Sequence, residues 1–78
     1  MITHTEHKTK FAVCINNDGY KASLEIGKLY PVIPDDDAAS HGYIRIIDES
    51  GEDYGYLEAH FFLLDVPQAL ANALKRAA

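Results

Sequence analysis

Short apolar runs, each bounded by turn-forming residues, occupy most of the chain up to residue 64. Their lengths and their content of β-branched and aromatic residues are typical of strands. Gly27 and Lys28 interrupt one run as a turn or a kink would, and Pro31, which lacks an amide donor, favours an edge strand or a bulge. The pattern predicts five strands, within residues 11–15, 23–33, 43–47, 54–57 and 58–64, the last of them after a turn or short helical twist.

Five short strands at close spacing predict a mainly β protein, either a small barrel or a sandwich. The composition of residues 34–42 predicts a surface loop within it. The side chains that we expect to face the interior are apolar and mostly alternate along the strands. They are Leu24, Ile26, Val32, Ile44, Ile46, Leu57 and Phe62, with Val13 or Cys14 from the first strand.

The period of the apolar residues changes near residue 65. Val66, Leu70 and Leu74 recur every four residues, which predicts a helix, and Asp65 is suited to cap its start. A helix this short is marginal alone, so we expect it to pack on the strands or on a second subunit. The expected organisation is a flexible leader over residues 1–10, a β-barrel over residues 11–64 and the helix over residues 65–78.

Length and charge exclude several classes of protein. A chain of 78 residues forms one domain and is too short for the large catalytic folds. Its net charge of -5 argues against direct nucleic-acid binding and against docking on an anionic membrane. One cysteine cannot form an internal disulfide, and no apolar run approaches the about 20 residues of a membrane helix. These features favour a cytoplasmic protein.

Residues that could carry chemistry are few. Cys14 lies in an apolar strand without a basic neighbour, so we expect a buried structural thiol. His4 and His7 could bind one metal ion together only if that segment were helical, and two ligands do not make a site. The acidic clusters at residues 35–37 and 48–53 lack the order of a calcium loop. Without a nucleophile–base pair, a phosphate loop or a metal-ligand spacing, we expect neither an enzyme nor a cofactor.

Two stretches carry a family resemblance. Residues 23–33 (SLEIGKLYPVI) resemble the diverging-turn segment of SH3 domains, and residues 55–62 (GYLEAHFF) resemble the SH3 segment of a glycine, an aromatic and an apolar residue before Pro-Ser-Asn-Tyr-Val. The span from Cys14 to Phe62 is similar to small, mostly uncharacterised bacterial and phage proteins with an SH3-like barrel. The resemblance implies a five-stranded SH3-like barrel, here followed by a short C-terminal α-helix.

Five tyrosines are many for this length, and they serve either as core or as a binding patch. The resemblance to SH3 domains puts Tyr43, Tyr56 and Phe61 where the rings of the peptide groove would stand, with Glu58 in place of a proline. We therefore expect a protein-interaction module that uses these four residues as an aromatic patch with an acidic rim. Too few rings remain to sandwich a polyproline peptide.

The expected ligand of that patch is a protein with an apolar anchor beside a basic group, and the expected oligomeric state is a monomer or a weak homodimer. The alternative function is an acidic inhibitor of phage type that mimics nucleic acid. Binding by a mimic weakens steeply with salt, whereas an aromatic interface tolerates salt better.

Overall fold

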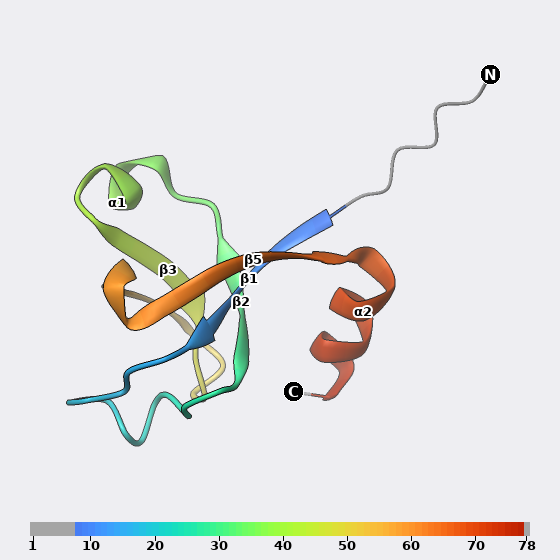
Figure 1. Ribbon diagram of the computed structural model, residues 1–78, viewed down its shortest axis with the longest axis horizontal. Helices are drawn as coiled ribbons and strands as arrows, with labels where there is room; N and C mark the ends of the chain where they lie inside the picture. The colour runs from blue at the N-terminus through green and yellow to red at the C-terminus, as the bar shows by residue number, and fades with distance from the viewer. Residues whose placement is uncertain (1–7, 78) are drawn as a thin grey trace.

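The strands follow one another along the chain and pair with antiparallel neighbours. The computed structural model describes residues 8–77, and five strands form one sheet in the order β4-β3-β2-β1-β5 (Figure 1). The elements are β1 (Lys8–Cys14), β2 (Leu29–Ile33), α1 (Asp36–Ser40), β3 (Tyr43–Ile47), β4 (Asp53–Leu57), the 3₁₀ turn η1 (Glu58–His60), β5 (Phe61–Pro67) and α2 (Gln68–Ala77). The prediction of a mainly β fold with five strands and a short C-terminal helix is confirmed. Over the described residues the sheet is not closed into a barrel, because β4 and β5 end the order.

Strand β2 is shared by two halves of the sheet, the first half β5–β1–β2 and the second half β2–β3–β4. Pro31 is paired with Phe11 of β1, whereas the next residue, Val32, is paired with Ile46 of β3. Of the two predicted alternatives for Pro31, an edge strand or a bulge, the edge strand is wrong, since β2 is internal. Pro31 lies where β2 passes from one partner to the other, so its missing amide donor falls at an end of the ladder with β1.

The ladder between β1 and β5 is longer than the sequence predicts at one end, where the start of β1 pairs with the end of β5. It runs from Lys8 opposite Pro67 to Cys14 opposite Phe61. Strand β1 thus includes residues 8–10, which the sequence places in the leader. Strand β5 continues through residues 65–67, three residues beyond its predicted end. Asp65 therefore does not cap the helix; its Oδ1 lies 3.1 Å from Nζ of Lys10. The two extensions pair with each other, and neither segment has an apolar alternation that would predict the pairing.

The main core draws side chains from all five strands. It contains Ala12, Cys14, Leu24, Tyr30, Ile44, Ile46, Tyr56 and Phe61, with Val32 and Leu63 partly buried against it. The predicted inward positions of Cys14, Leu24, Ile44 and Ile46 are confirmed. Leu24 reaches this core from the loop before β2 rather than from a strand.

Three residues predicted for the core, Ile26, Leu57 and Phe62, are exposed instead. Leu57 is opposite Tyr43 across the ladder and Tyr56 is opposite Ile44. Directly opposed residues share a face of the sheet, so Tyr56 faces inward and Leu57 outward. In β5 the alternation of inward and outward residues is likewise shifted by one residue from the prediction, so Phe61 faces inward and Phe62 outward. Ile26 lies in a turn, because β2 begins only at Leu29.

A second, smaller core lies on the opposite face of the first half, under α2. Phe11 and Val66 of the sheet and Ala71 of α2 are buried there. Leu74 packs against them, but Leu70 is exposed, contrary to its predicted role in docking the helix. Figure 1 shows α1 and α2 at opposite ends of the molecule.

The loop predicted between β2 and β3 contains the short helix α1. Asp35 caps it, its Oδ1 accepting a hydrogen bond of 3.0 Å from the amide of Ala38. Oδ2 of the same residue lies 3.1 Å from a guanidinium nitrogen of Arg45 on β3. One carboxylate thus starts the helix and ties it to the sheet, a role typical of aspartate at an N-cap.

Candidate functional site

Two of the four residues predicted to bind a partner, Tyr56 and Phe61, are buried, with only 4% and 6% of their surfaces exposed. Their expected exposure is wrong. Each has an apolar neighbour, Leu57 or Phe62, so alternation along the strand could be phased in two ways. The pairing with the adjacent strand decides the phase, and the sequence does not display that pairing.

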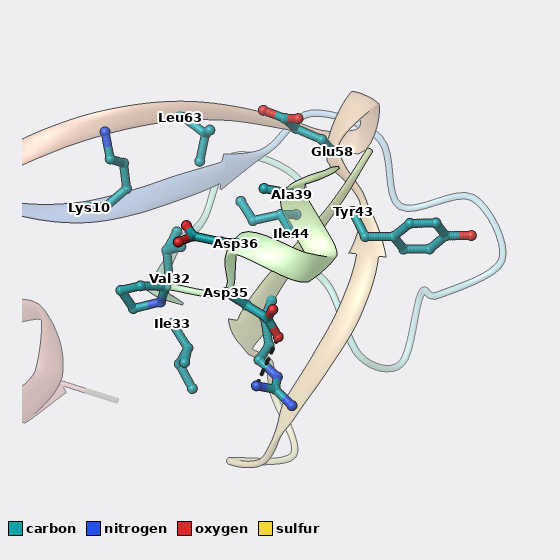
Figure 2. Close-up of a pocket in the computed structure, with 12 residues that line it drawn as sticks. Lys10, Val32, Ile33, Asp35, Asp36, Ala39, Tyr43, Ile44, Glu58 and Leu63 are labelled. Atoms are coloured by element: carbon teal, nitrogen blue, oxygen red, sulfur yellow. Dashed lines mark ion pairs between the residues drawn. The ribbon is translucent and has the colours of Figure 1, made fainter. Parts of the chain in front are cut away.

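The other two predicted residues, Tyr43 and Glu58, lie at a small pocket beside α1 that has a volume of about 220 Å³. Val32, Ile44 and Leu63 form its apolar part (Figure 2). The ring of Tyr43 points away from these side chains in Figure 2. The volume is below the range of about 300–1,000 Å³ in which small molecules usually bind, so the pocket is a shallow opening of the core.

Both cations that line this pocket, Lys10 and Arg45, are already paired with carboxylates, Lys10 with Asp65 at 3.1 Å. Nη1 of Arg45 lies 3.1 Å from Oδ2 of Asp35, and its Nε lies 2.9 Å from Oδ2 of Asp53 (Figure 2 marks the first pair). Two carboxylates on one guanidinium leave no net positive charge for an anionic ligand. Arg45 therefore fastens α1 and β4 to β3.

The structure brings together a different set of rings, which the sequence did not single out. Tyr20 and Tyr54 are 45% and 62% exposed, and both pack on the buried Tyr56. The ring centroids of Tyr20 and Tyr56 are 5.0 Å apart at 89°, and those of Tyr54 and Tyr56 are 6.2 Å apart at 57°. These are the edge-to-face and tilted geometries that aromatic pairs prefer. The exposed rings of Tyr20 and Tyr54 on Tyr56 are termed the aromatic patch.

Tyr20 is placed by the loop between β1 and β2. Gly19 has a φ of +85°, a left-handed conformation that glycine adopts without strain and that turns the chain just before Tyr20. The Tyr20 amide donates to the Asn17 carbonyl at 2.8 Å, and the Leu24 amide donates to the Tyr20 carbonyl at 2.8 Å. Because Leu24 is anchored in the core, the loop holds Tyr20 in place.

Tyr56 is fixed by a buried carboxylate. Its hydroxyl donates a 2.7 Å hydrogen bond to Oδ2 of Asp48, which is itself buried. Burial would raise the pKa of Asp48, but hydrogen bonds from Ser50 and Tyr56 outweigh it and hold that pKa below its usual value. Burial, together with the bond to Asp48, raises the pKa of Tyr56 to about 12. The pair is therefore an ionised acceptor and a neutral donor at neutral pH.

The charged residues close in sequence to the rings of the patch are mainly acidic. Asp18 precedes Tyr20 by two residues, Glu52 precedes Tyr54 by two residues, and both are exposed. The Asp48 carboxylate lies behind Tyr56, and Lys21 is the cation next to Tyr20 in sequence. This arrangement favours an apolar group accompanied by a cation.

The remaining candidates from the sequence do not add a reactive site. Cys14 is buried, and burial raises the pKa of its thiol, which disfavours the nucleophilic thiolate. Within residues 8–77 no three His, Cys, Asp or Glu residues are grouped so that they could hold a metal ion. His4 and His7 lie outside the described residues. Neither helix in the described part of the chain is long and apolar enough to cross a membrane.

No protein-family model, curated protein or solved structure matches this chain. The site therefore rests on its geometry alone. One sequence signal for the missed residues was the number of tyrosines. The packing of Tyr20, from the loop between β1 and β2, on Tyr56 of β4 was not visible in any local pattern.

Proposed function

We propose that the protein is a protein-interaction module and that the aromatic patch is the surface that binds its partner. The observation that carries the proposal is the pair of exposed rings, Tyr20 and Tyr54, held on one buried ring. Tyrosine is enriched in interface hot spots because it offers a large apolar area with few rotatable bonds.

The support beneath the rings favours tight binding. Tyr56 is packed in the core and bonded to Asp48, so the rings above it lose little conformational entropy when a partner arrives. The negative residues beside the rings favour a partner segment that places a lysine or arginine next to an apolar anchor. The module is thus a small scaffold that presents a prearranged aromatic surface.

Tyr43 and Glu58 remain a second candidate surface for the same function. Tyr43 is exposed beside Leu57 on the outer face of the second half. It lacks the buried ring that supports Tyr20 and Tyr54, so we rank it second. The two surfaces are separable, because their tyrosines lie on different elements.

The fold supports an SH3-like barrel as the scaffold of this module. The strand order β4-β3-β2-β1-β5, the division of β2 between two halves and the 3₁₀ turn between β4 and β5 agree with that architecture. The amide of Ile15 donates to the carbonyl of His60 at 2.9 Å, which draws the end of β1 towards that turn. We infer an incompletely closed SH3-like barrel.

Mimicry of nucleic acid is less favoured as the function. A mimic needs carboxylates that are free to meet a basic partner. Several acids of this chain are engaged within it: Asp35 and Asp53 with Arg45, Asp48 with Tyr56, Glu49 with Lys28, and Asp65 with Lys10. Steep weakening of partner binding by salt would favour mimicry over the aromatic patch.

The proposal is tested by selecting binders from a phage-displayed library of random peptides against the wild-type chain. We expect enriched peptides to combine an aromatic or aliphatic residue with a lysine or arginine. Each enriched peptide is then titrated against the double variant Tyr20→Ala/Tyr54→Ala. Loss of two hot-spot rings should weaken binding by at least about tenfold, since each costs about 1 kcal/mol or more.

The matched control is Tyr43→Ala, which removes an equally exposed tyrosine from the other surface. It should bind the selected peptides as the wild type does. If Tyr43→Ala abolishes binding while the double variant retains it, the partner surface lies at Tyr43 and Glu58. Circular dichroism of each variant confirms that the fold is retained.

A further inference from the structure

A larger cavity lies away from the aromatic patch, between β2, the loop after β3 and the end of α2. Its volume is about 440 Å³, within the range of about 300–1,000 Å³ typical of small-molecule sites. Its walls are mostly apolar and come from five side chains: Phe11, Leu29, Pro31, Ile47 and Leu74. The cavity can therefore hold an apolar body.

The polar groups that line the cavity converge at one place. Tyr30 donates a 2.6 Å hydrogen bond from its hydroxyl to Oε2 of Glu49. Nζ of Lys28 lies 2.7 Å from the same oxygen and 3.0 Å from Oε1. Nζ also lies 5.6 Å from the centroid of the Tyr30 ring. A carboxylate and a ring face thus define a position that suits an ammonium group.

The charge at this end is negative overall. The lining residues include the carboxylates of Asp48 and Glu49 but only one ammonium, that of Lys28. Hydrogen bonds from Lys28 and Tyr30 lower the pKa of Glu49, so its carboxylate is ionised at neutral pH. Burial, then the bond to Glu49, raises the pKa of Tyr30, so its hydroxyl stays a donor. An anionic ligand would be repelled here and a cationic one attracted.

We propose that this cavity binds a primary amine with an apolar body, whose ammonium takes the place of Lys28 Nζ between Glu49 and the Tyr30 ring. The Lys28 side chain is 42% exposed, so it can swing into solvent when a ligand displaces it. The apolar body then lies along Phe11, Leu29 and Leu74. This site contains none of the three rings of the aromatic patch, its link to them being Asp48, which accepts from Tyr56, and it does not depend on the proposed function.

The test uses three probes of matched size on the full chain: phenylbutylamine, phenylbutanol and phenylbutyrate. Binding is followed by chemical-shift changes of backbone amides in two-dimensional NMR. The amine should bind about two- to fivefold more tightly than the alcohol, at most the effect of one partly exposed ion pair, and the carboxylate should bind most weakly. The largest shifts should fall on residues 27–31, residues 47–51 and Leu74.

Two substitutions at the polar end sharpen the test in opposite directions. Glu49→Gln should abolish the preference for the amine over the alcohol. Lys28→Met removes the competing cation and should raise affinity for the amine several-fold, while affinity for the alcohol changes less. An increase of this kind does not arise from a damaged fold, so it keeps the proposal testable if Glu49→Gln is unstable.

A pair of variants on α2 locates the apolar body. Leu74→Trp fills the cavity and should abolish binding of all three probes, whereas Leu70→Trp adds the same ring at an exposed position of the helix and should not. Equal affinity for amine and carboxylate, shifts concentrated at Tyr20 and Tyr54, or no saturable binding at millimolar concentration would overturn the proposal.

Discussion

The two halves of the sheet use their outer faces differently. In the first half, α2 covers Phe11 and Val66, so part of this outer face is a second core. In the second half the corresponding face carries the exposed side chains of Tyr43, Arg45 and Leu57. The first half is therefore packed from both sides, whereas the outer face of the second half is open except at Ile47, which lines the cavity beside Leu74. Substitutions should therefore lower the free energy of unfolding at residues that hold the fold, and change it little at residues that are free to bind.

The sharpest contrast lies within the outer face of the first half. Phe11 and Phe62 point to the same side, because Phe11 is paired with Leu64 and Phe62 with Val13. Phe11 is 1% exposed under α2, and Phe62 is 63% exposed beyond it. Phe11→Ala should lower the free energy of unfolding by about 3–5 kcal/mol. Phe62→Ala should lower it by less than about 0.5 kcal/mol. Urea denaturation of both variants measures the difference.

The next prediction concerns the phase of β4. Ile44→Ala should cost about 2–4 kcal/mol of stability, since Ile44 is buried beside Tyr56. Leu57→Ala should cost less than about 1 kcal/mol, because Leu57 is half exposed on the outer face. Thermal unfolding reports both. Similar costs at the two positions would show that Leu57, not Tyr56, faces the core.

The contact between α2 and the sheet can be tested by overpacking. Ala71 is fully buried against Phe11 and Val66, so Ala71→Leu should destabilise the protein by about 1–3 kcal/mol. Ala69→Leu, on an exposed position of the same helix, should leave stability nearly unchanged. Unchanged stability in both variants would show that α2 does not pack on the second core.

These contrasts also define what the sequence could predict. Strand β3 was predicted at its observed bounds, because Ile44 and Ile46 alternate with exposed residues and turn residues flank them. The inward-facing residues of β4 and β5 were not predicted correctly. In each strand two adjacent residues are apolar, Tyr56–Leu57 and Phe61–Phe62, so either could face inward. There the choice depends on the partner strand, which local alternation cannot report.

The sequence predicted a tyrosine-based binding patch, which stays a prediction, and it did not predict which tyrosines pack together. The excess of tyrosines indicated a possible binding surface, and the resemblance to SH3 domains directed attention to Tyr43 and Tyr56. The exposed rings that pack on Tyr56 are Tyr54, two residues away on β4, and Tyr20, which only tertiary packing brings there. The extended ladder of Lys10 with Asp65 was missed for the same reason.

The smallest expected effect is on the loss of stability at acidic pH. The folded-state pKa of Asp48 is lowered, since hydrogen bonds outweigh burial. Its contribution is therefore present above the unfolded pKa of about 4 and is lost as pH falls through the lower folded value. Asp48→Asn should cost about 1 kcal/mol at pH 7 and flatten the fall in stability between about pH 5 and 3. Asp36→Asn, on an exposed acid of α1, is the matched control variant.

The central claim is that the aromatic patch, not the open face of the second half, meets the partner. The most direct measurement is an NMR titration of the wild-type chain with a peptide selected from the random library. The account predicts saturable shifts at the amides of Tyr20, Tyr54 and His60, with those of Tyr43 and Leu57 unmoved. Shifts concentrated at Tyr43, Leu57 and Glu58 would contradict it.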